Sequence, residues 1–292
     1  MKNHFSRRDF LKTAAISVPA VILPSYAMAG EKQNKGISTN TLNKNPLKLG
    51  LMTYRLGMKW DIDTIIKNCT ETKFEHVELR TTHAHGVEVT LSAAERSAVK
   101  KRFADAGIAI SLASGFRYNS PDPAVLKKNI DGTKEYTLLA KDVGAIGVRV
   151  FGDNANDDKL MRQIGEALAE VGEFGYNNGV DIRVCDDGPT VAMVKRNIEA
   201  SKSPYVYLNW NCPMSDIEGD GFEANFNSVK NLIRNVHLRD LYNDYPWRLF
   251  FSLLSKSGYK GYLDAEVPES DEDPIRFMKY YRALFLALQD AV

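Results

Sequence analysis

The sequence predicts an α/β protein whose eight parallel strands close into a (β/α)8 barrel. Eight short apolar, β-branched runs alternate with longer segments of helical periodicity. Because a helical segment follows each run, the strands are expected to be parallel and joined by helices. Residues 46–292 are also close in number to the ~250 residues typical of this barrel. These three observations favour one closed barrel.

The helices of the predicted barrel are bounded by local signals. Ser92 and Glu95 are spaced as a capping box, and Gly107 ends the helix that they begin. Pro121 opens the next helix. On the last helix, the aromatic stripe that includes Phe285 is expected to face the core. The expected strand and helix of each unit are, in chain order, 48–53 and 61–72, 74–79 and 91–106, 108–112 and 121–143, 145–151 and 157–176, 180–184 and 190–201, 205–210 and 222–232, 233–238 and 246–257, and 261–267 and 273–290.

An open, doubly wound sheet is the alternative arrangement of the same elements. The count of eight strands favours closure, because eight strand and helix pairs make one full barrel. No G-x-G-x-x-G motif follows the first expected strand, so the sequence does not support a dinucleotide site.

The N-terminus resembles a twin-arginine export signal. Residues 6–12 read S-R-R-D-F-L-K, and a modest apolar stretch follows at 14–23. The small residues of A-M-A at 27–29 then precede Gly30, as at a cleavage site. The alternative interpretation is a basic, disordered N-terminus.

The domain organisation follows from this signal. Residues 1–29 are expected to be a removed signal peptide, residues 30–45 a polar, disordered linker, and residues 46–292 the barrel domain. The apolar stretch has about half of the ~20 residues that span a bilayer and contains Pro19 and Pro24. We therefore expect export to a bacterial periplasm by the twin-arginine route, with no membrane attachment after cleavage.

The composition is that of a protein with a small-molecule partner. The formal net charge is +1, with 44% hydrophobic and 26% charged residues, so no global charge attracts nucleic acid. Cys69, Cys185 and Cys212 are an odd number and do not make a disulfide framework. The sequence is compatible with one disulfide bridge or with three separate thiols. It is also compatible with a homo-oligomer.

Polar side chains gather where the expected strands end, which is where a parallel barrel carries its site. Several arginines in one mouth suit a carboxylate, sulfate or phosphate on a substrate. The candidate substrate-binding residues are Tyr54, Arg55, Glu78, Arg80, His83, Arg117, Arg149, Trp210, Arg239 and Asp240.

Structural roles for the same residues stay open. Each arginine can be a surface residue or pair with a nearby acid. Tyr54 and Trp210 can be sugar-stacking platforms or ordinary core, and His83 can be a loop residue without a role. His76 is expected to be a strand residue with a hydrogen-bonded ring.

Two motifs near the C-terminus are moderately specific: N-V-H-L-R-D at 235–240, and G-Y-K-G at 258–261 followed by Glu266. More general motifs precede them at 48–51, 76–79 and 140–145. Over roughly residues 47–290, the chain resembles the sugar phosphate isomerase/epimerase family of xylose-isomerase-like TIM barrels.

The resemblance implies a divalent metal held by Glu, Asp, His and Glu on strands five to eight. His237 and Glu266 match that pattern, whereas Cys185 stands at the strand-five position and Asn211 at the strand-six position. Loss of two carboxylates weakens a site for Mg²⁺ or Mn²⁺, while Cys, His and Glu suit Zn²⁺. The sequence is therefore compatible with two alternatives: a site for Zn, Mn or Mg, or no metal at all.

The resemblance also implies proton abstraction next to a carbonyl. Glu266 is the candidate base and His237 the second catalytic residue, and a metal or an arginine would meet the oxyanion. We expect an exported isomerase or epimerase acting on an unphosphorylated sugar or keto-sugar. The alternatives are a 3-keto-glycoside lyase or hydratase using the same enediolate chemistry, and a non-catalytic sugar-binding barrel with a degenerate metal site.

Overall fold

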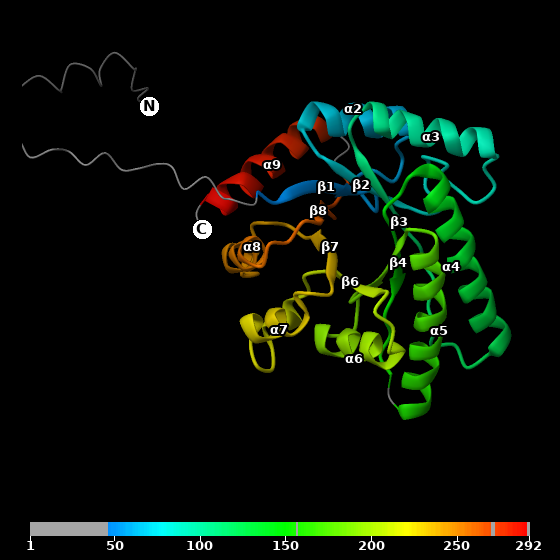
Figure 1. Cartoon of the computed structure of the whole chain (residues 1–292). Helices are drawn as coiled ribbons and strands as arrows, with labels where there is room; N and C mark the ends of the chain where they lie inside the picture. The colour runs from blue at the N-terminus through cyan, green and yellow to red at the C-terminus, as the bar shows by residue number, and fades with distance from the viewer. Residues whose placement is uncertain (1–45, 156, 270–271, 291–292) are drawn as a thin grey trace, which may run out of the picture. The chain divides into compact units, whose positions relative to one another are not determined.

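Eight parallel strands form a closed barrel in the computed structural model, which describes residues 46–155, 157–269 and 272–290 (Figure 1). Each strand pairs with the next in the chain, and the last pairs with the first, so the sheet has no free edge. This confirms the predicted (β/α)8 barrel. The strands are β1 (Lys48–Met52), β2 (His76–Arg80), β3 (Ala109–Ala113), β4 (Gly147–Phe151), β5 (Asp181–Cys185), β6 (Val206–Trp210), β7 (Ile233–Leu238) and β8 (Tyr262–Ala265).

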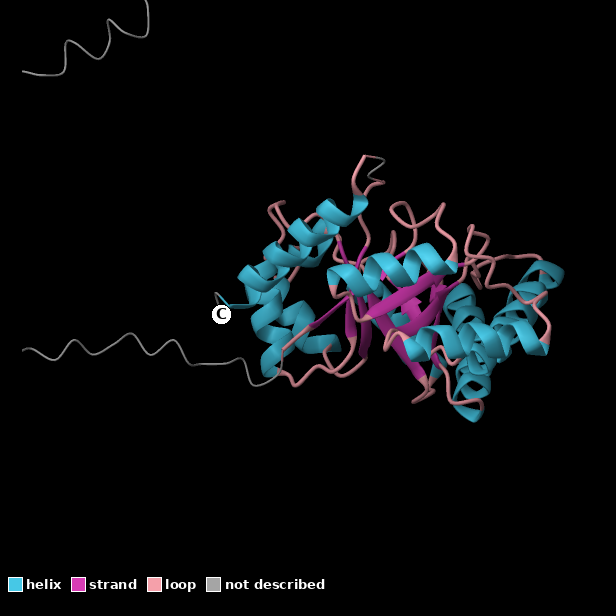
Figure 2. Cartoon of the chain, turned by 90° about the horizontal axis from the view of Figure 1, so that it is seen from above, coloured by secondary structure: helices cyan, strands magenta, loops and turns pink. Residues whose placement is uncertain are grey.

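The described helices surround the strands, as the second view shows (Figure 2). Each expected helix is present within a few residues of its predicted bounds. A short 3₁₀ helix, η1 (Met214–Ile217), follows β6 and was not predicted. The α-helices are α2 (Ile62–Thr72), α3 (Ala93–Asp105), α4 (Pro123–Val143), α5 (Asp158–Asn177), α6 (Val191–Ser201), α7 (Phe222–Val229), α8 (Trp247–Lys256) and α9 (Pro274–Asp290).

Local side chains determine where these helices begin. The capping box of Ser92 and Glu95 is formed at the start of α3, with each side chain bonded to the other residue's backbone N–H. Asp61 caps α2 in a similar way by accepting from the backbone N–H of Thr64 at 2.8 Å. These caps fix the loops that join β2 to α3 and β1 to α2, and both loops form part of the rim of the barrel mouth.

The inside of the barrel is polar, whereas a barrel of this type is ordinarily filled by branched apolar side chains. Strand residues alternate, so that apolar side chains face the helices and polar ones face inward. His76 Nδ1 lies 2.7 Å from Asp264 Oδ1, and His76 Nε2 lies 2.9 Å from Ser111 Oγ. The expected hydrogen-bonded ring of His76 is thus confirmed. We call the inward-facing, hydrogen-bonded residues of six strands the polar belt: His76, Ser111, Arg183, Asn209, Asn235 and Asp264.

Gly50 on β1 makes room for this belt. A Cβ atom at Gly50 would lie 1.9 Å from Asp264 Oδ1 and 2.9 Å from the carbonyl oxygen of His76. Only a residue without a side chain allows Asp264 to approach β1 so closely. The polar belt therefore closes across the barrel only with glycine at this position.

Trp210 lies on the outward side of β6 and not in the barrel mouth. Its indole is fully buried, packs against Phe250, and donates from Nε1 to Asp216 Oδ2 at 2.6 Å and to the Tyr245 hydroxyl at 3.0 Å. The prediction that Trp210 binds substrate is therefore wrong, because the indole is fully buried in the aromatic core and its N–H already has partners.

The predicted signal peptide (1–29) and linker (30–45) lie outside the described residues. The three cysteines are buried free thiols. Within the described part of the chain, every helix is too short or too polar to cross a membrane.

Candidate active site

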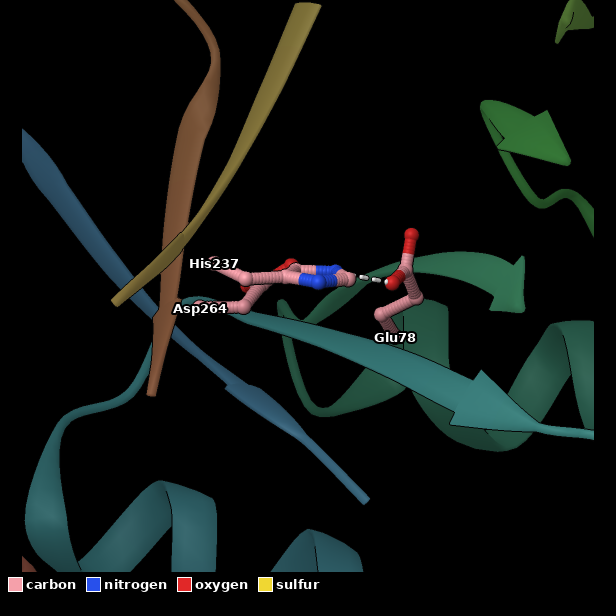
Figure 3. A group of neighbouring side chains, drawn as sticks. All are labelled: Glu78, His237 and Asp264. Carbon is pink, nitrogen blue, oxygen red and sulfur yellow. Dashed lines mark hydrogen bonds and ion pairs between the residues drawn. The ribbon is translucent and has the colours of Figure 1, made fainter. Parts of the chain in front are cut away.

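Two side chains from opposite sides of the polar belt meet directly above it. Nε2 of His237, on β7, lies 2.5 Å from Oε2 of Glu78, on β2, and both residues are buried (Figure 3). Each side chain points inward because it alternates with apolar neighbours on its strand. A buried carboxylate and a buried imidazole at this distance form a charge-assisted hydrogen bond.

The surroundings favour the charged form of both partners. Burial alone would lower the pKa of His237, but the charge of Glu78 and hydrogen bonds to Cys185 and Glu78 raise it well above its ordinary value. Burial alone would raise the pKa of Glu78, but the charge of His237 and the hydrogen bond to it lower that pKa below its ordinary value. An imidazolium and a carboxylate therefore face each other near neutral pH.

Glu266 lies on the other side of the His237 ring. Its Oε2 atom is 3.6 Å from His237 Nδ1 and 3.0 Å from Nη1 of Arg239. The backbone N–H of Glu266 donates to the carbonyl of Leu238, which extends the pairing of β7 and β8 and holds Glu266 at the strand ends. His237 and Glu266 therefore lie side by side at the C-terminal ends of β7 and β8.

Arg239 connects Glu266 to the loops that follow β5 and β6. Its Nε atom donates to the carbonyl of Asn211 at 3.3 Å, and its Nη2 atom lies 3.8 Å from Asp187 Oδ1. The Asn211 side chain in turn donates to Asp187 at 3.2 Å. The guanidinium of Arg239 thus contacts residues that follow three strands, β5, β6 and β8, at the barrel mouth.

The residues at the predicted metal positions offer little negative charge. Cys185 is hydrogen-bonded to His237 and lies 3.8 Å from Asn209 Nδ2. The carboxylate of Glu266 is already paired with a guanidinium, and Cys185 and Asn211 replace two carboxylates of the pattern. Cys185, Asn211, His237 and Glu266 therefore do not fit a divalent metal in this arrangement.

A second group in the described residues could hold a metal ion. Glu78, His237 and Asp264 are buried, and each offers one ligand atom within 4.8 Å of the others (Figure 3). These atoms already have partners, since Glu78 binds His237, and Asp264 accepts from His76 at 2.7 Å and Asn235 at 2.8 Å. The group fits a hydrogen-bonded chain better than a metal site, because a metal would break these bonds.

Arg149 is the most deeply buried of the predicted site arginines. Its side chain extends from β4 into the barrel, and the residue is 4% exposed. The guanidinium carbon lies 4.1 Å from the centre of the Phe151 ring. Its Nε and Nη1 atoms have no hydrogen-bond partner within the residues that the structure describes.

The remaining predicted residues lie around the rim. Arg117 Nη1 is 2.6 Å from Asp153 Oδ1, which is the paired role considered for the arginines. Tyr54 is 42% exposed and stacks on His83 with ring centres 6.3 Å apart. Burial and the neighbouring His85 and Arg80 lower the pKa of His83 to about 4. Of the other three, the half-buried Arg80 ends β2, and Arg55 and Asp240 follow β1 and β7, with Arg55 lying 5.9 Å from the Tyr54 ring centre.

Sequence reasoning missed the polar belt and a buried acid pair. Asp186 and Asp216 interact by charge, and burial raises the pKa of Asp216 to about 7. The signal for the belt was available, because polar residues alternate along β5 and β8, whereas buried parallel strands ordinarily read as continuous apolar runs. The acid pair gave no such signal, since it joins loops distant in the sequence.

Comparisons with known proteins agree with this architecture. A family model described as a xylose isomerase-like TIM barrel matches residues 66–283. No curated protein sequence matches the chain.

Several solved structures share the fold. An L-ribulose 3-epimerase is 17% identical, with a TM-score of 0.71 over 84% of this chain and 95% of its own. A 3-keto-D-glucoside 4-epimerase from E. coli is 15% identical, with a TM-score of 0.69 over 83% of this chain and 100% of its own. A D-psicose 3-epimerase in the presence of D-fructose is 15% identical, with a TM-score of 0.66 over 84% and 95%.

Proposed function

The chain belongs to the xylose isomerase-like TIM barrel family, and from that premise we propose that it is a sugar isomerase or epimerase. In the proposed reaction, the enzyme abstracts a proton from the carbon next to the carbonyl of a sugar or keto-sugar. The 3-epimerase and 4-epimerase activities named for the similar structures support this class of reaction.

One observation carries the proposal: Glu266 Oε2 lies 3.6 Å from His237 Nδ1 and 3.0 Å from Arg239 Nη1 at the mouth. Glu266 is the proposed base that takes the proton from carbon. Arg239 and the imidazolium of His237 supply positive charge where the oxyanion develops. Base and cations thus lie in one cluster at the C-terminal ends of β7 and β8.

Glu78 supports this cluster from below. Its hydrogen bond to Nε2 keeps His237 charged and fixes the orientation of the ring, so that Nδ1 faces Glu266. Cys185 is hydrogen-bonded to the same imidazole and is the second group that can carry a proton to the substrate. In this account, Glu78 positions and charges His237, while Glu266 and His237 act on the substrate.

The donor sets described above fit a metal poorly, so no step of the proposed reaction runs through one. In place of a metal, the charged side chains of Arg239 and His237 polarise the carbonyl of the substrate. A carbonyl oxygen that receives two charge-assisted hydrogen bonds is stabilised as it becomes an enolate.

A lyase remains the second candidate, because it shares the first step. The E. coli neighbour is named for a 3-keto-glucoside. If the same carbanion expelled an aglycone instead of regaining a proton, this chain would cleave such a compound.

Solvent exchange tests both candidates. The full chain is incubated in D₂O with L-ribulose, D-fructose, D-psicose, a 3-keto-glucoside and the anionic keto-sugar 2-keto-D-gluconate, and the products are followed by NMR. Deuterium entering the carbon next to the carbonyl supports proton abstraction, and an epimer or a released aglycone separates epimerase from lyase. Absence of exchange and of aglycone from every compound would contradict the proposal.

We also propose that the protein is exported to the periplasm by the twin-arginine route and acts on unphosphorylated sugars. The arginine pair and the A-M-A site of the N-terminal sequence support this location. N-terminal sequencing of protein from the periplasmic fraction is expected to begin at Gly30. Recovery of the uncleaved chain in the cytoplasm would contradict export.

A further inference from the structure

Two arginines occupy the same level of the barrel, on β2 and β4, and only the small residue Ala113 of β3 lies between them. Arg80 on β2 pairs in register with Ala113 on β3, and Ala113 pairs with Arg149 on β4. Neighbouring strands lie about 4.8 Å apart, so the two arginine backbones are separated by about 10 Å. Because Ala113 is short, space remains between the two long side chains.

Neither guanidinium is neutralised by a carboxylate of its own. The carboxylate that interacts with Arg149 by charge is Glu78, which is hydrogen-bonded to His237 instead. Arg80 donates from Nη1 to the backbone carbonyl of Thr81 at 2.9 Å and to the hydroxyl of the same residue. No described carboxylate forms an ion pair with Arg149 or Arg80, in contrast to the rim residue Arg117 and its partner Asp153.

The two positive charges also disfavour each other. Burial and the charge of Arg149 lower the pKa of Arg80. Buried charged side chains are almost always paired, since an isolated charge is costly to remove from water. Arg149 retains two buried N–H groups, on Nε and Nη1, with no partner in the described chain. An anion placed between Arg80 and Arg149 would satisfy these groups and remove the repulsion.

We propose that Arg149 and Arg80 bind an oxyanion carried by the substrate, so that the substrate is an anionic keto-sugar. This inference rests on the proposed function, because it assigns the substrate class of the same mouth. A planar guanidinium matches a carboxylate or phosphate with two parallel hydrogen bonds. Arg149, stacked on Phe151, is the inner contact and the half-buried Arg80 is the outer one.

Glu78 orients the sugar relative to this anion site. Its Oε1 atom is buried and has no hydrogen-bond partner among the described residues, and its charge interacts with that of Arg149. A sugar hydroxyl can donate to Glu78 Oε1 while the anionic group accepts from Arg149. The anion site and Glu266 would therefore hold two different parts of one substrate.

Calorimetric titration of the full chain tests the substrate class. The probes are D-fructose as the neutral keto-sugar, 2-keto-D-gluconate and 5-keto-D-gluconate as carboxylates, and D-fructose 6-phosphate as the phosphate. At least one anionic probe is expected to bind about tenfold more tightly than D-fructose. A preference for a keto-gluconate assigns the site to a carboxylate, whereas a preference for fructose 6-phosphate would assign it to a phosphate and contradict the proposed unphosphorylated substrate. Equal or weaker binding of all three anions would overturn the inference.

Two variants locate the site. Arg149→Gln and Arg80→Gln are each expected to reduce the affinity for the preferred anion to nearly that for D-fructose. Arg234→Gln is the control, because Arg234 stacks 4.0 Å from the Tyr207 ring at the opposite end of the barrel. Anion affinity unchanged in Arg80→Gln and in folded Arg149→Gln would overturn the inference. Since Arg80 is only half-buried, its variant remains informative if Arg149→Gln does not fold.

Deuterium exchange separates this inference from the proposed function. If anions bind at Arg149 but no keto-sugar exchanges its proton, the anion site stands and the proposed function fails. If neutral keto-sugars exchange at the same rate as anionic ones, and Arg149→Gln leaves both rates unchanged, the proposed function stands and the anion site fails.

Discussion

Nε2 of His237 lies 2.5 Å from Oε2 of Glu78, and neither side chain reaches solvent. The pair joins β7 to β2 across the barrel, so it contributes to folding as well as to the charge of the mouth. Breaking such a pair by neutralising one partner leaves the other charge buried without compensation.

Glu78→Gln is therefore expected to lower the free energy of unfolding by about 3 to 5 kcal/mol. Urea denaturation monitored by circular dichroism measures this. Glu75→Gln, an exposed glutamate three residues earlier on the same segment, serves as the matched control and is expected to change stability by less than about 0.5 kcal/mol. Equal stability of the two variants would contradict the buried ion pair.

Gly50→Ala tests the polar belt. The added methyl group would overlap Asp264 Oδ1, so Asp264 must move away from His76. We expect a loss of about 1 to 3 kcal/mol in unfolding free energy. Gly115→Ala is the control, because its added Cβ would meet only Arg80 Nη2, at 3.5 Å. A Gly50→Ala protein as stable as Gly115→Ala would contradict the packing around Asp264.

The buried acid Asp216 predicts a pH dependence of stability. Burial raises the pKa of Asp216 from 3.8 to about 7, so the folded state holds a proton that the unfolded chain has released between these values. The contribution of Asp216 to the free energy of unfolding is therefore largest below pH 3.8. It decreases as the pH rises from 3.8 to about 7 and is lost above about pH 7. The expected loss is about 3 kcal/mol between about pH 5 and about pH 8.

Asp216→Asn isolates this contribution from the other titrating groups. The amide cannot ionise, so the stability of the variant relative to the wild type should rise by about 3 kcal/mol from about pH 5 to about pH 8. Asp220→Asn, an exposed residue of the same loop, should show no such change. Identical pH profiles for Asp216→Asn and the wild type would show that Asp216 titrates normally.

The barrel could be predicted from the sequence because each strand and each helix carries its own local signal. The capping box at Ser92 and the apolar residues spaced along β7 needed no knowledge of distant residues. The proximity of His237 and Glu266 could be expected from the family motif and from the rule that strand ends meet at one rim.

The partners of these residues could not be predicted in the same way. Glu78 and His237 are 159 positions apart, and which carboxylate contacts the imidazole depends on barrel register and side-chain direction. Trp210 precedes Asn211 directly, but the alternation along β6 turns the indole outward into the core. Composition alone does not tell whether a strand residue points into the barrel or outward toward the helices.

The donor atoms of the site predict that the protein works without a tightly bound divalent metal. Elemental analysis of the full chain is expected to find well below one metal ion per molecule, and dialysis against a chelator should leave proton exchange unchanged. One stoichiometric metal whose removal abolishes exchange would contradict the account, because His237 and Glu266 would then be ligands rather than partners of each other.

The most direct test of the central claim is the rate at which Glu266→Gln exchanges solvent deuterium into a keto-sugar that the wild type accepts. Glu269→Gln, which changes an exposed acid of the same loop, is the control. If Glu266 is the base, its variant should lose at least about a hundredfold in exchange rate while remaining folded, and the control should not. Undiminished exchange in folded Glu266→Gln would contradict the claim.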